Sequence, residues 1–409
     1  MQAQFLNTAV GIGNSICRDA IRHDGQCNWV GVNNDIEGDN AKPYYAALKS
    51  TWYNGTSGIA WFLAQLSEVS GDKRHREVAI GAIEQALRTA DKVQHGKLGF
   101  HSGITGIAFS AIEIGEKLSR EELVERGLQL LRSLQQLPES EYTLDVIDGC
   151  AGAIPAIIKL NRRYADPTLD ALLAKMGDHL IQTAQAESKG ISWNTMPHGS
   201  AASLTGYAHG AAGIASALLE LWHYTQDERY KKAGLAGFAY EDACFDAEQQ
   251  NWPDFREGNS PRQAGDNSPR PCGCAWCHGA PGIGLSRLRA FQLTGNEDFK
   301  KSAQIAVSTT LRFLGRQQLG NYSLCHGVFG NADLLLCASD IVGDEALVPK
   351  VEAVAAEGVE LFERRKIPFP NGTQSEFSAP DMMLGQAGVG YGFLRLADRK
   401  RFESVLLVH

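Results

Sequence analysis

The chain has 409 residues, of which 44% are hydrophobic and 21% are charged, the balance of an ordinary globular protein. Its formal net charge of −8 argues against nucleic-acid binding, and no apolar run approaches the roughly 20 residues that membrane insertion requires. The nine cysteines are scattered rather than arranged as a disulfide framework, and the N-terminus lacks a secretory signal. We therefore expect a cytoplasmic protein.

Seven stretches predict amphipathic helices, because apolar residues recur at helical spacing with charges on the opposite face. Leu123, Leu128 and Leu131 follow this spacing in the third stretch. The seven stretches cover residues 4–22, 75–93, 120–137, 167–187, 228–246, 297–315 and 346–366. Alternation typical of strands is scarce, so an all-α protein is expected.

A second set of seven predicted helices alternates with the first, and each begins at a Gly-x-x-Gly motif followed by an apolar run. The first glycines of the motifs are Gly55, Gly103, Gly149, Gly210, Gly279, Gly327 and Gly385. Such a period indicates a repeat architecture. Because the second set is apolar nearly all round, we expect a single domain, residues 1–409, that is an α/α toroid of seven inner and seven outer helices.

The glycines would let seven helix ends crowd around one axis, since glycine permits backbone angles and close approaches that a Cβ forbids. The longest interruption of the period, residues 247–273, is rich in Pro, Gly, Ser and Asn and predicts a long surface loop. This loop leads directly into Cys277. It could form a wall over the rim of the toroid or be an inert connection.

The residues just before each Gly-x-x-Gly should meet at one rim of the toroid. Cys277 and Cys325 hold equivalent places in consecutive repeats, so we expect their sulfurs to converge. Two thiolates with a histidine suit one Zn²⁺ ion per chain. The four candidates are Cys277, His278, Cys325 and His326.

Two arrangements of this site are possible. All four residues could close a structural site, or three could bind zinc and leave the fourth position open for water or substrate, as in catalytic sites. Adjacent residues usually point in different directions, so we favour three ligands. Cys272 and Cys274, in "CGCAWC", are spare ligands, a redox pair or incidental; their place in the loop favours the last.

His209 and Asp145 are candidates for acid–base chemistry. His209 is the rim residue of the fourth repeat, and Asp145 lies shortly before Gly149. Each has a structural alternative: a hydrogen-bonded histidine, and a helix N-cap that Asp148 could equally provide. A metal-bound thiolate beside a histidine and a carboxylate would suit the addition of sulfur to an electrophile.

Several segments together resemble the lanthipeptide cyclases, the LanC-like family: "WCHGAPGIGLSRL", "LCHGVFGNADLLL", "GYAHGAAGIASALLEL", "DVIDGCAGAI" and "MMLGQAGVGYGFLRLAD". The resemblance runs nearly end to end and is closest to the cyclase half of two-part, class II synthetases. It implies the same toroid. No dehydratase half is present in 409 residues, so the chain is expected to be a stand-alone enzyme or the cyclase domain of a longer one.

The resemblance implies a zinc-dependent lanthipeptide cyclase, in which a cysteine thiol of a precursor peptide adds to dehydroalanine or dehydrobutyrine in the same peptide and closes a (methyl)lanthionine ring. Cys277, Cys325 and His326 match the zinc ligands, and the substrate thiol would take the fourth position. His209 matches the active-site histidine and Asp145 its acidic partner. The implied partner is a dehydrated precursor peptide, and a dehydratase is a second candidate.

Two positions differ among the members that the chain resembles. His278 stands where some members carry tyrosine, and the resemblance implies a hydrogen bond to the enolate oxygen. Gly273 stands where some stand-alone cyclases carry arginine. Either Arg270 or Arg256 replaces that arginine, or its function is dispensable in this chain.

Three other functions compete with this interpretation. The chain could add glutathione to dehydroamino acids in proteins, as animal relatives suggest. It could be a zinc prenyltransferase, although those enzymes use Asp, Cys and His ligands and the two matched cysteines argue against it. It could be a zinc-stabilised scaffold that only binds peptides, which a closed site including His278 would favour. The fold alone does not decide, because toroids host unrelated functions.

Overall fold

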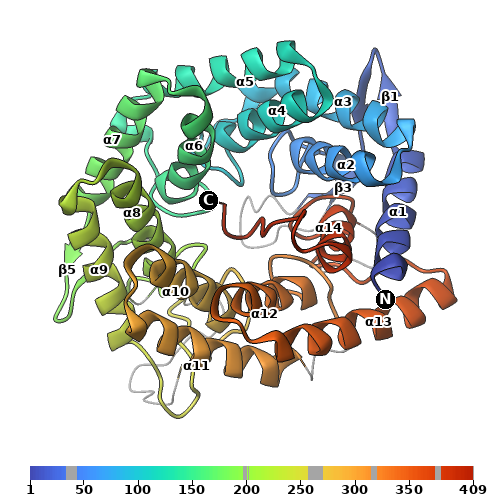
Figure 1. The fold of residues 1–409 in the computed structure, drawn as a ribbon. Coiled ribbons are helices and arrows are strands. Elements are labelled where there is room, and N and C mark those ends of the chain that lie inside the picture. Colours follow the sequence, from blue (N-terminus) through green and yellow to red (C-terminus); the bar gives the residue numbers. More distant parts are fainter. Residues whose placement is uncertain are drawn as a thin grey trace.

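The computed structural model describes residues 1–33, 44–196, 200, 202–256, 270–314, 320–373 and 379–408. These residues form fourteen α-helices and three short antiparallel hairpins. Odd-numbered helices make an outer ring and even-numbered helices an inner ring (Figure 1). The predicted α/α toroid of seven inner and seven outer helices is therefore confirmed.

The inner helices are α2 (Thr56–Ser70), α4 (Ile104–Leu118), α6 (Cys150–Tyr164), α8 (Ala211–Thr225), α10 (Ala280–Thr294), α12 (Val328–Val342) and α14 (Gln386–Ala397). The outer helices are α1 (Gln2–Asp19), α3 (Lys73–Arg88), α5 (Glu121–Ser133), α7 (Pro167–Gln182), α9 (Glu228–Ala243), α11 (Glu297–Leu314) and α13 (Val348–Arg365). The hairpins pair β1 (Ile21–His23) with β2 (Gln26–Asn28), β3 (Val30–Asn33) with β4 (Tyr44–Ala47), and β5 (Gln185–Ala186) with β6 (Ile191–Ser192).

Each predicted outer helix overlaps an observed one, but several predicted ends are wrong. The prediction of helix over 4–22 includes residues 21 and 22, which are the first two residues of β1. Asp24 and Gly25 follow with φ of 48° and 72°, the left-handed pair that a tight Asp-Gly hairpin turn requires. Likewise α7 ends at Gln182, before the short β5–β6 hairpin, rather than at residue 187.

Short links join most inner helices to the outer helix that follows. After α2, Gly71 takes a left-handed conformation that ends the helix, and the Asp72 side chain accepts the Arg74 N–H to start α3. Asp166 and Asp227 start α7 and α9 in the same way. Helix α1 packs against α14, so the first and last helices complete the seventh pair and close the ring.

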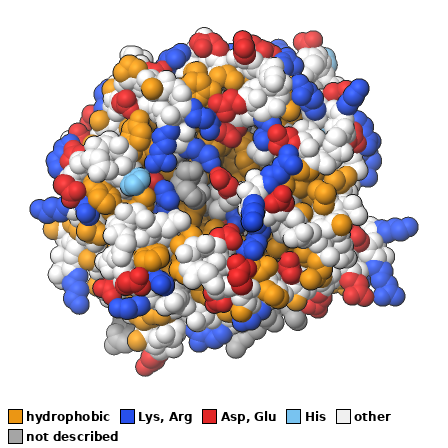
Figure 2. Space-filling model, viewed as in Figure 1, with side chains coloured by type: hydrophobic (Ala, Val, Ile, Leu, Met, Phe, Trp, Pro, Cys, Tyr) orange, Lys and Arg blue, Asp and Glu red, His pale blue; other side chains and the backbone are white. Residues whose placement is uncertain are grey.

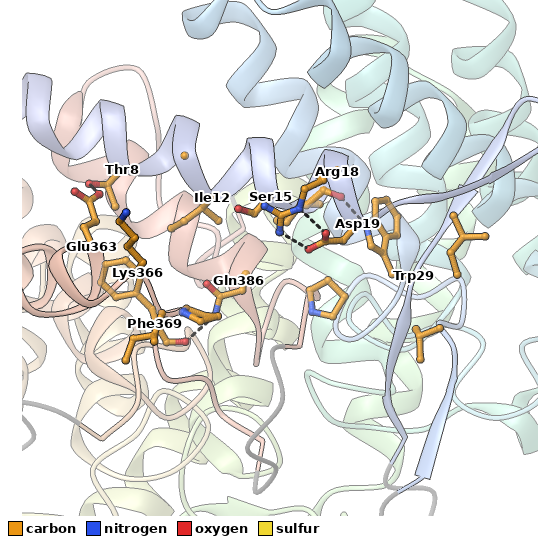
Figure 3. A pocket seen from close by; sticks show the side chains of 17 residues that line it. Thr8, Ile12, Ser15, Arg18, Asp19, Trp29, Glu363, Lys366, Phe369 and Gln386 are labelled. Carbon is orange, nitrogen blue, oxygen red and sulfur yellow. Dashed lines mark hydrogen bonds and ion pairs between the residues drawn. The ribbon is translucent and has the colours of Figure 1, made fainter.

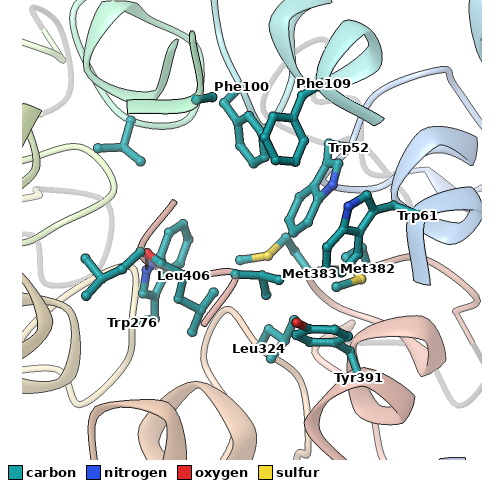
Figure 4. Close-up of a cluster of buried hydrophobic side chains, with 14 of the residues drawn as sticks. Trp52, Trp61, Phe100, Phe109, Trp276, Leu324, Met382, Met383, Tyr391 and Leu406 are labelled. Carbon is teal, nitrogen blue, oxygen red and sulfur yellow. Dashed lines mark hydrogen bonds between the residues drawn. The ribbon is translucent and has the colours of Figure 1, made fainter. Parts of the chain in front are cut away.

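Aromatic side chains from different repeats fill the centre of the toroid (Figure 4). Trp52 and Trp276 are both buried there. The C-terminal segment is bound to Trp276 and Tyr391. Trp276 Nε1 donates to the Leu406 carbonyl oxygen at 3.2 Å, and the Tyr391 hydroxyl donates to the Glu403 carbonyl oxygen at 2.7 Å. The axis of the toroid is therefore packed with side chains and with the chain's own C-terminal segment.

Charged side chains of both signs are interspersed over the face seen in Figure 2, around a hollow near its middle. Ion pairs such as Lys117–Glu68, at 2.7 Å, and Lys159–Glu403, at 3.1 Å, join neighbouring parts of the chain. The excess of acidic over basic residues is therefore not concentrated on this face. In the described part of the chain, every helix falls short of the length and apolar character that crossing a bilayer requires.

Candidate metal centre and active site

The seven loops that precede the inner helices meet in a closed belt of backbone hydrogen bonds. At each step an N–H of one loop donates to a carbonyl oxygen of the next loop, at 2.8–3.3 Å. The steps are Tyr53 to His101, Ser102 to Ile147, Val146 to Ala208, Ala208 to Cys277, Cys277 to Cys325, Cys325 to Met383, and Met383 back to Tyr53. We call this arrangement the loop belt. It brings equivalent positions of consecutive repeats side by side.

Glycines make this tight belt possible. A Cβ on Gly152 would fall well inside van der Waals contact with the Val146 carbonyl oxygen, and one on Gly330 would collide with that of Leu324. The second glycine of each motif has this relationship to the carbonyl six residues earlier. Glycine is therefore required at these positions because the backbone approaches this carbonyl oxygen closely, as the sequence predicts. Among the first glycines of the motifs, an unusual backbone angle is needed only at Gly279, whose φ is 93°.

Cys277 and Cys325 are neighbours in the loop belt, and His326 follows the second of them. The ligand atoms of these three residues all lie within 4.8 Å of one another. Nε2 of His326 hydrogen-bonds the carbonyl oxygen of Gly372 at 2.9 Å. This bond orients the ring and leaves Nδ1 as the nitrogen available to a metal.

The chemistry of this donor set fits zinc. Hydrogen bonds with Cys325 and His326 lower the pKa of Cys277 well below its usual range. The pKa of Cys325 is raised by its bond with Cys277 and by burial. Thiolates and an imidazole are ligands that zinc prefers. The three residues could therefore hold a metal ion.

His278 lies outside this group of ligand atoms. Its Nε2 is 3.6 Å from Oδ1 of Asp254 instead, and burial lowers its pKa. Arg256 holds the same carboxylate with two of its nitrogens, at 2.6–3.1 Å. Burial opposes ionisation of Asp254, but the bonds from Arg256 lower its pKa to about 2. This geometry favours the three-ligand arrangement over the closed one.

Arg256 also interacts electrostatically with the two thiols. Burial alone would lower its pKa, but Asp254 and the negative charges of Cys277 and Cys325 raise it. Its Nη1 makes no hydrogen bond with any residue that the structure describes. Arg270, the other candidate cation, has its guanidinium 5.2 Å from the centre of the Phe255 ring.

Asp254 and Arg256 come from the predicted surface loop 247–273, which is only partly at the surface. Its residues 257–269 lie outside the described residues, and those before them enter the interior, where Trp252 is buried. Thr205 Oγ1 donates to the Pro253 carbonyl oxygen at 2.7 Å and fixes this stretch. Sequence reasoning missed Asp254. Aromatic residues within a polar insertion were the signal of burial that could have revealed it.

His209 and Asp145 form a pair. Nδ1 of His209 is 2.5 Å from Oδ2 of Asp145, whose other oxygen accepts the Asp148 N–H at 2.8 Å. Burial would lower the pKa of His209, but the bond with Asp145 and nearby negative charges, including that of Cys277, raise it. Because Asp145 occupies Nδ1, Nε2 is the nitrogen that can face a substrate.

The remaining candidates have no such arrangement. Cys272 and Cys274 lie outside the group of ligand atoms, and burial raises the pKa of each thiol to about 12. His101 is a belt residue to which the sequence assigned no role. It is buried with its ring 5.1 Å from that of Trp276, and burial lowers its pKa to about 3. Its low pKa favours the neutral imidazole.

Two relatives are similar to this chain in sequence. The chain is 23% identical over 403 residues to the lacticin 481/lactococcin biosynthesis protein LcnDR2 of Lactococcus lactis subsp. lactis, covering 94% of this chain and 39% of that protein. It is 24% identical over 308 residues to glutathione S-transferase LANCL1 of Danio rerio, covering 72% and 71% of the two chains. The chain thus spans about two fifths of the length of the first of these relatives.

The fold resembles that of nisin cyclase, with a TM-score of 0.64 and 19% identity over 86% of this chain and 89% of that one. Residues 46–407 match the family model described as lanthionine synthetase C-like protein. The match covers most of the chain and includes every residue of the candidate site. The chain therefore belongs to the lanthionine synthetase C-like family.

Proposed function

We propose that this chain is a zinc-dependent cyclase that joins a cysteine thiol to dehydroalanine or dehydrobutyrine within a precursor peptide, giving a thioether ring. The observation that carries the proposal is the grouping of Cys277, Cys325 and His326 within 4.8 Å in the loop belt. The His209–Asp145 pair supports it, because Cys277 contributes to the raised pKa of His209. Membership of the family is consistent with it.

Cys277, Cys325 and His326 would hold the ion. Bound there, zinc would lower the pKa of the peptide's cysteine, so that a thiolate is available at neutral pH. The carbonyl of Gly372 keeps His326 in its orientation.

The reaction adds S–H across a C=C bond and involves no net oxidation. The C–S bond forms at the β-carbon, the electron pair of the double bond moves to the carbonyl oxygen to give an enolate, and the α-carbon then takes a proton. We propose that His209 carries the proton from the thiol to the α-carbon. Its raised pKa favours the imidazolium, which is the form that donates this proton. Asp145 is a positioning residue that binds Nδ1.

The enolate needs a cation or hydrogen-bond donors. Arg256 fits this role, because Asp254 anchors Nε and Nη2 of its guanidinium, Nη1 makes no hydrogen bond with a described residue, and the thiols act electrostatically on the group. His278 is buried next to Cys277 and is a further candidate donor. These assignments make Arg256 the replacement for the arginine that other members carry at the position of Gly273.

A second candidate function uses the same residues on a different thiol. The relative from Danio rerio is named a glutathione S-transferase, which favours addition of glutathione to a dehydroamino acid. The two functions differ in whether the thiol and the double bond belong to one molecule.

A synthetic test peptide of about ten residues, with one dehydroalanine and one cysteine three residues apart, separates the two functions. Ring closure leaves the mass unchanged but blocks alkylation of the thiol, which mass spectrometry detects. We expect the zinc-loaded protein to close the ring and the His209→Ala variant to be slower by about 100-fold. A cysteine-free peptide offered with glutathione tests the alternative. If a folded His209→Ala, Cys325→Ala double variant closed the ring at the wild-type rate, the proposal would be refuted.

A further inference from the structure

A groove of about 670 Å³ lies between α1, the β1–β2 hairpin and the C-terminal end of α13 (Figure 3). This volume falls within the range of about 300–1,000 Å³ of small-ligand sites. Ile12, Ile16, Trp29 and Phe369 give it an apolar lining. The groove is distinct from the metal centre, whose residues do not line it.

Exposed apolar side chains gather at this groove. Seven large hydrophobic residues of the described chain are exposed, and three of them line this groove. Ile21, Val30 and Ile367 line the groove with 56%, 53% and 47% of their surface exposed. Tyr44 and Tyr45 lie on β4, which pairs with β3. Apolar surface concentrated in this way marks a site of interaction.

The groove and the metal centre are built from the same two loops. Phe369 lines the groove, and three residues later the carbonyl of Gly372 holds His326. Gln386 also lines the groove and donates from Nε2 to the Phe369 carbonyl oxygen at 2.7 Å. The loop before Gln386 contains the belt residue Met383. A molecule in the groove would therefore sit beside the wall of the active site.

The lining suits an extended peptide better than a globular partner. Ile21 and Val30 belong to β1 and β3, and each of these strands pairs with a single strand among those described. An edge strand can pair with an extended chain through its free backbone groups. Among the charged groups of the lining, Asp19 pairs with Arg18 and Glu363 accepts from the Thr8 hydroxyl. The Lys366 ammonium makes no ion pair with a described residue, so an acidic side chain is favoured there. A globular partner would need about 800 Å² of surface on each side.

We propose that this groove binds an extended segment of the precursor peptide, with bulky apolar side chains and an acidic residue, that lies outside the ring being closed. The inference rests on the proposed function for the identity of the substrate. Binding there would raise the local concentration of the reacting thiol at the metal centre without new contacts to it.

A fluorescein-labelled groove peptide tests binding without any chemistry. It has about ten residues in which leucine and phenylalanine alternate with serine and glutamate, and it contains neither cysteine nor dehydroalanine. Fluorescence anisotropy should show binding to the wild type and at least about tenfold weaker binding to Val30→Asp and Ile367→Asp, because each loses a buried apolar contact. Both side chains are exposed, so the variants should fold.

Leu235→Asp is the matched control, because Leu235 is an exposed apolar residue on α9 that does not line the groove. It should bind the groove peptide as the wild type does. Cys325→Ala should also bind it, which separates the groove from the chemistry. Absence of binding to the wild type, or equal binding by Ile367→Asp, would overturn the proposal. So would a dimer that Ile367→Asp dissociates in sedimentation, since a second copy would then cover the groove.

Joining the groove peptide to the N-terminus of the test peptide gives a readout on the reaction. We expect the KM of the joined peptide to fall at least about fivefold in the wild type, with kcat unchanged, because the added segment binds equally in ground and transition states. Ile367→Asp should lose this advantage and Leu235→Asp should keep it. An unchanged KM in the wild type would contradict the proposal even if ring closure itself proceeds.

Discussion

The backbone N–H of Cys277 donates a hydrogen bond to the carbonyl oxygen of Cys325 at 3.3 Å, although the two residues lie in different repeats. This is one step of the loop belt, in which every repeat is joined to the next. Because the bond fixes the two backbones side by side, it also fixes the two sulfurs close together before any metal is considered. The belt thus prepares the ligand set that we assign to zinc.

Replacing Cys325 by alanine should remove the metal and leave the fold. The helices are held by the packed core and the belt, whose hydrogen bonds use only backbone atoms at this position. We expect about one zinc per chain in the wild type and background zinc in Cys325→Ala. Elemental analysis and circular dichroism measure the two quantities. Cys272→Ala is the control and should retain zinc, because Cys272 lies outside the ligand group.

Replacing Gly152 by alanine should destabilise the protein. The new Cβ would collide with the Val146 carbonyl oxygen, a backbone atom that the belt holds in place. Overpacking of this kind costs about 3 kcal/mol of the free energy of unfolding. The control is Gly11→Ala in α1, where a Cβ meets nothing within 4 Å. It should instead add about 0.5–1 kcal/mol, since alanine suits a helix better. Urea unfolding compares the two; equal stabilities would refute the steric account.

The repeats made much of this structure predictable. The glycines mark equivalent positions in the repeats, so the reactive residues that precede them occupy equivalent positions in the loop belt. On this basis Cys277 and Cys325 could be paired from sequence. The order within the pairs was harder to see. The sequence predicts that the two sets of helices alternate, but it does not show that α1 packs against α14 at the opposite end of the chain.

The parts outside the repeat could not be placed in the same way. Asp254 and Arg256 lie in an insertion that has no counterpart in other repeats, so nothing in the period indicates that they return to the rim. Ile367, just after α13, and Val30 of β3 line one groove only because the folded chain brings these two segments to it. Contacts of this kind depend on tertiary packing, which neither hydrophobic periodicity nor motif spacing reports.

The His209–Asp145 pair predicts activity that declines as the pH rises. Burial lowers the pKa of His209, but Asp145 raises it by more, so the net pKa is above the usual value for histidine. The imidazolium therefore persists above the usual histidine range. Where protonation of the α-carbon limits the rate, activity is present below the raised pKa and lost as the pH rises through it. Asp145→Asn removes the charge that raises this pKa. We therefore expect the decline to move to lower pH.

The same pair predicts the direction in which the stability of the folded protein changes with pH. A raised pKa in the folded state means that the pair stabilises the protein below the unfolded pKa of histidine, about 6.5, and loses this effect as the pH rises through the folded pKa. NMR titration of labelled imidazoles measures the pKa directly, with His209→Gln identifying the resonance. The control is Asp178→Asn on α7, whose carboxylate binds Tyr230 and Arg229. An unchanged titration in Asp145→Asn would contradict the assignment.

Arg256 and Arg270 make a matched pair for testing which cation serves the enolate. Arg256→Gln should lower kcat on the test peptide by about 100-fold, the usual cost of losing one donor to a developing oxyanion. Its zinc content should not change, because the ligand group does not include Arg256. Arg270→Gln should leave kcat unchanged, since its guanidinium lies over Phe255. Loss of activity in Arg270→Gln alone would transfer the role to Arg270 and leave Arg256 as a partner of Asp254 only.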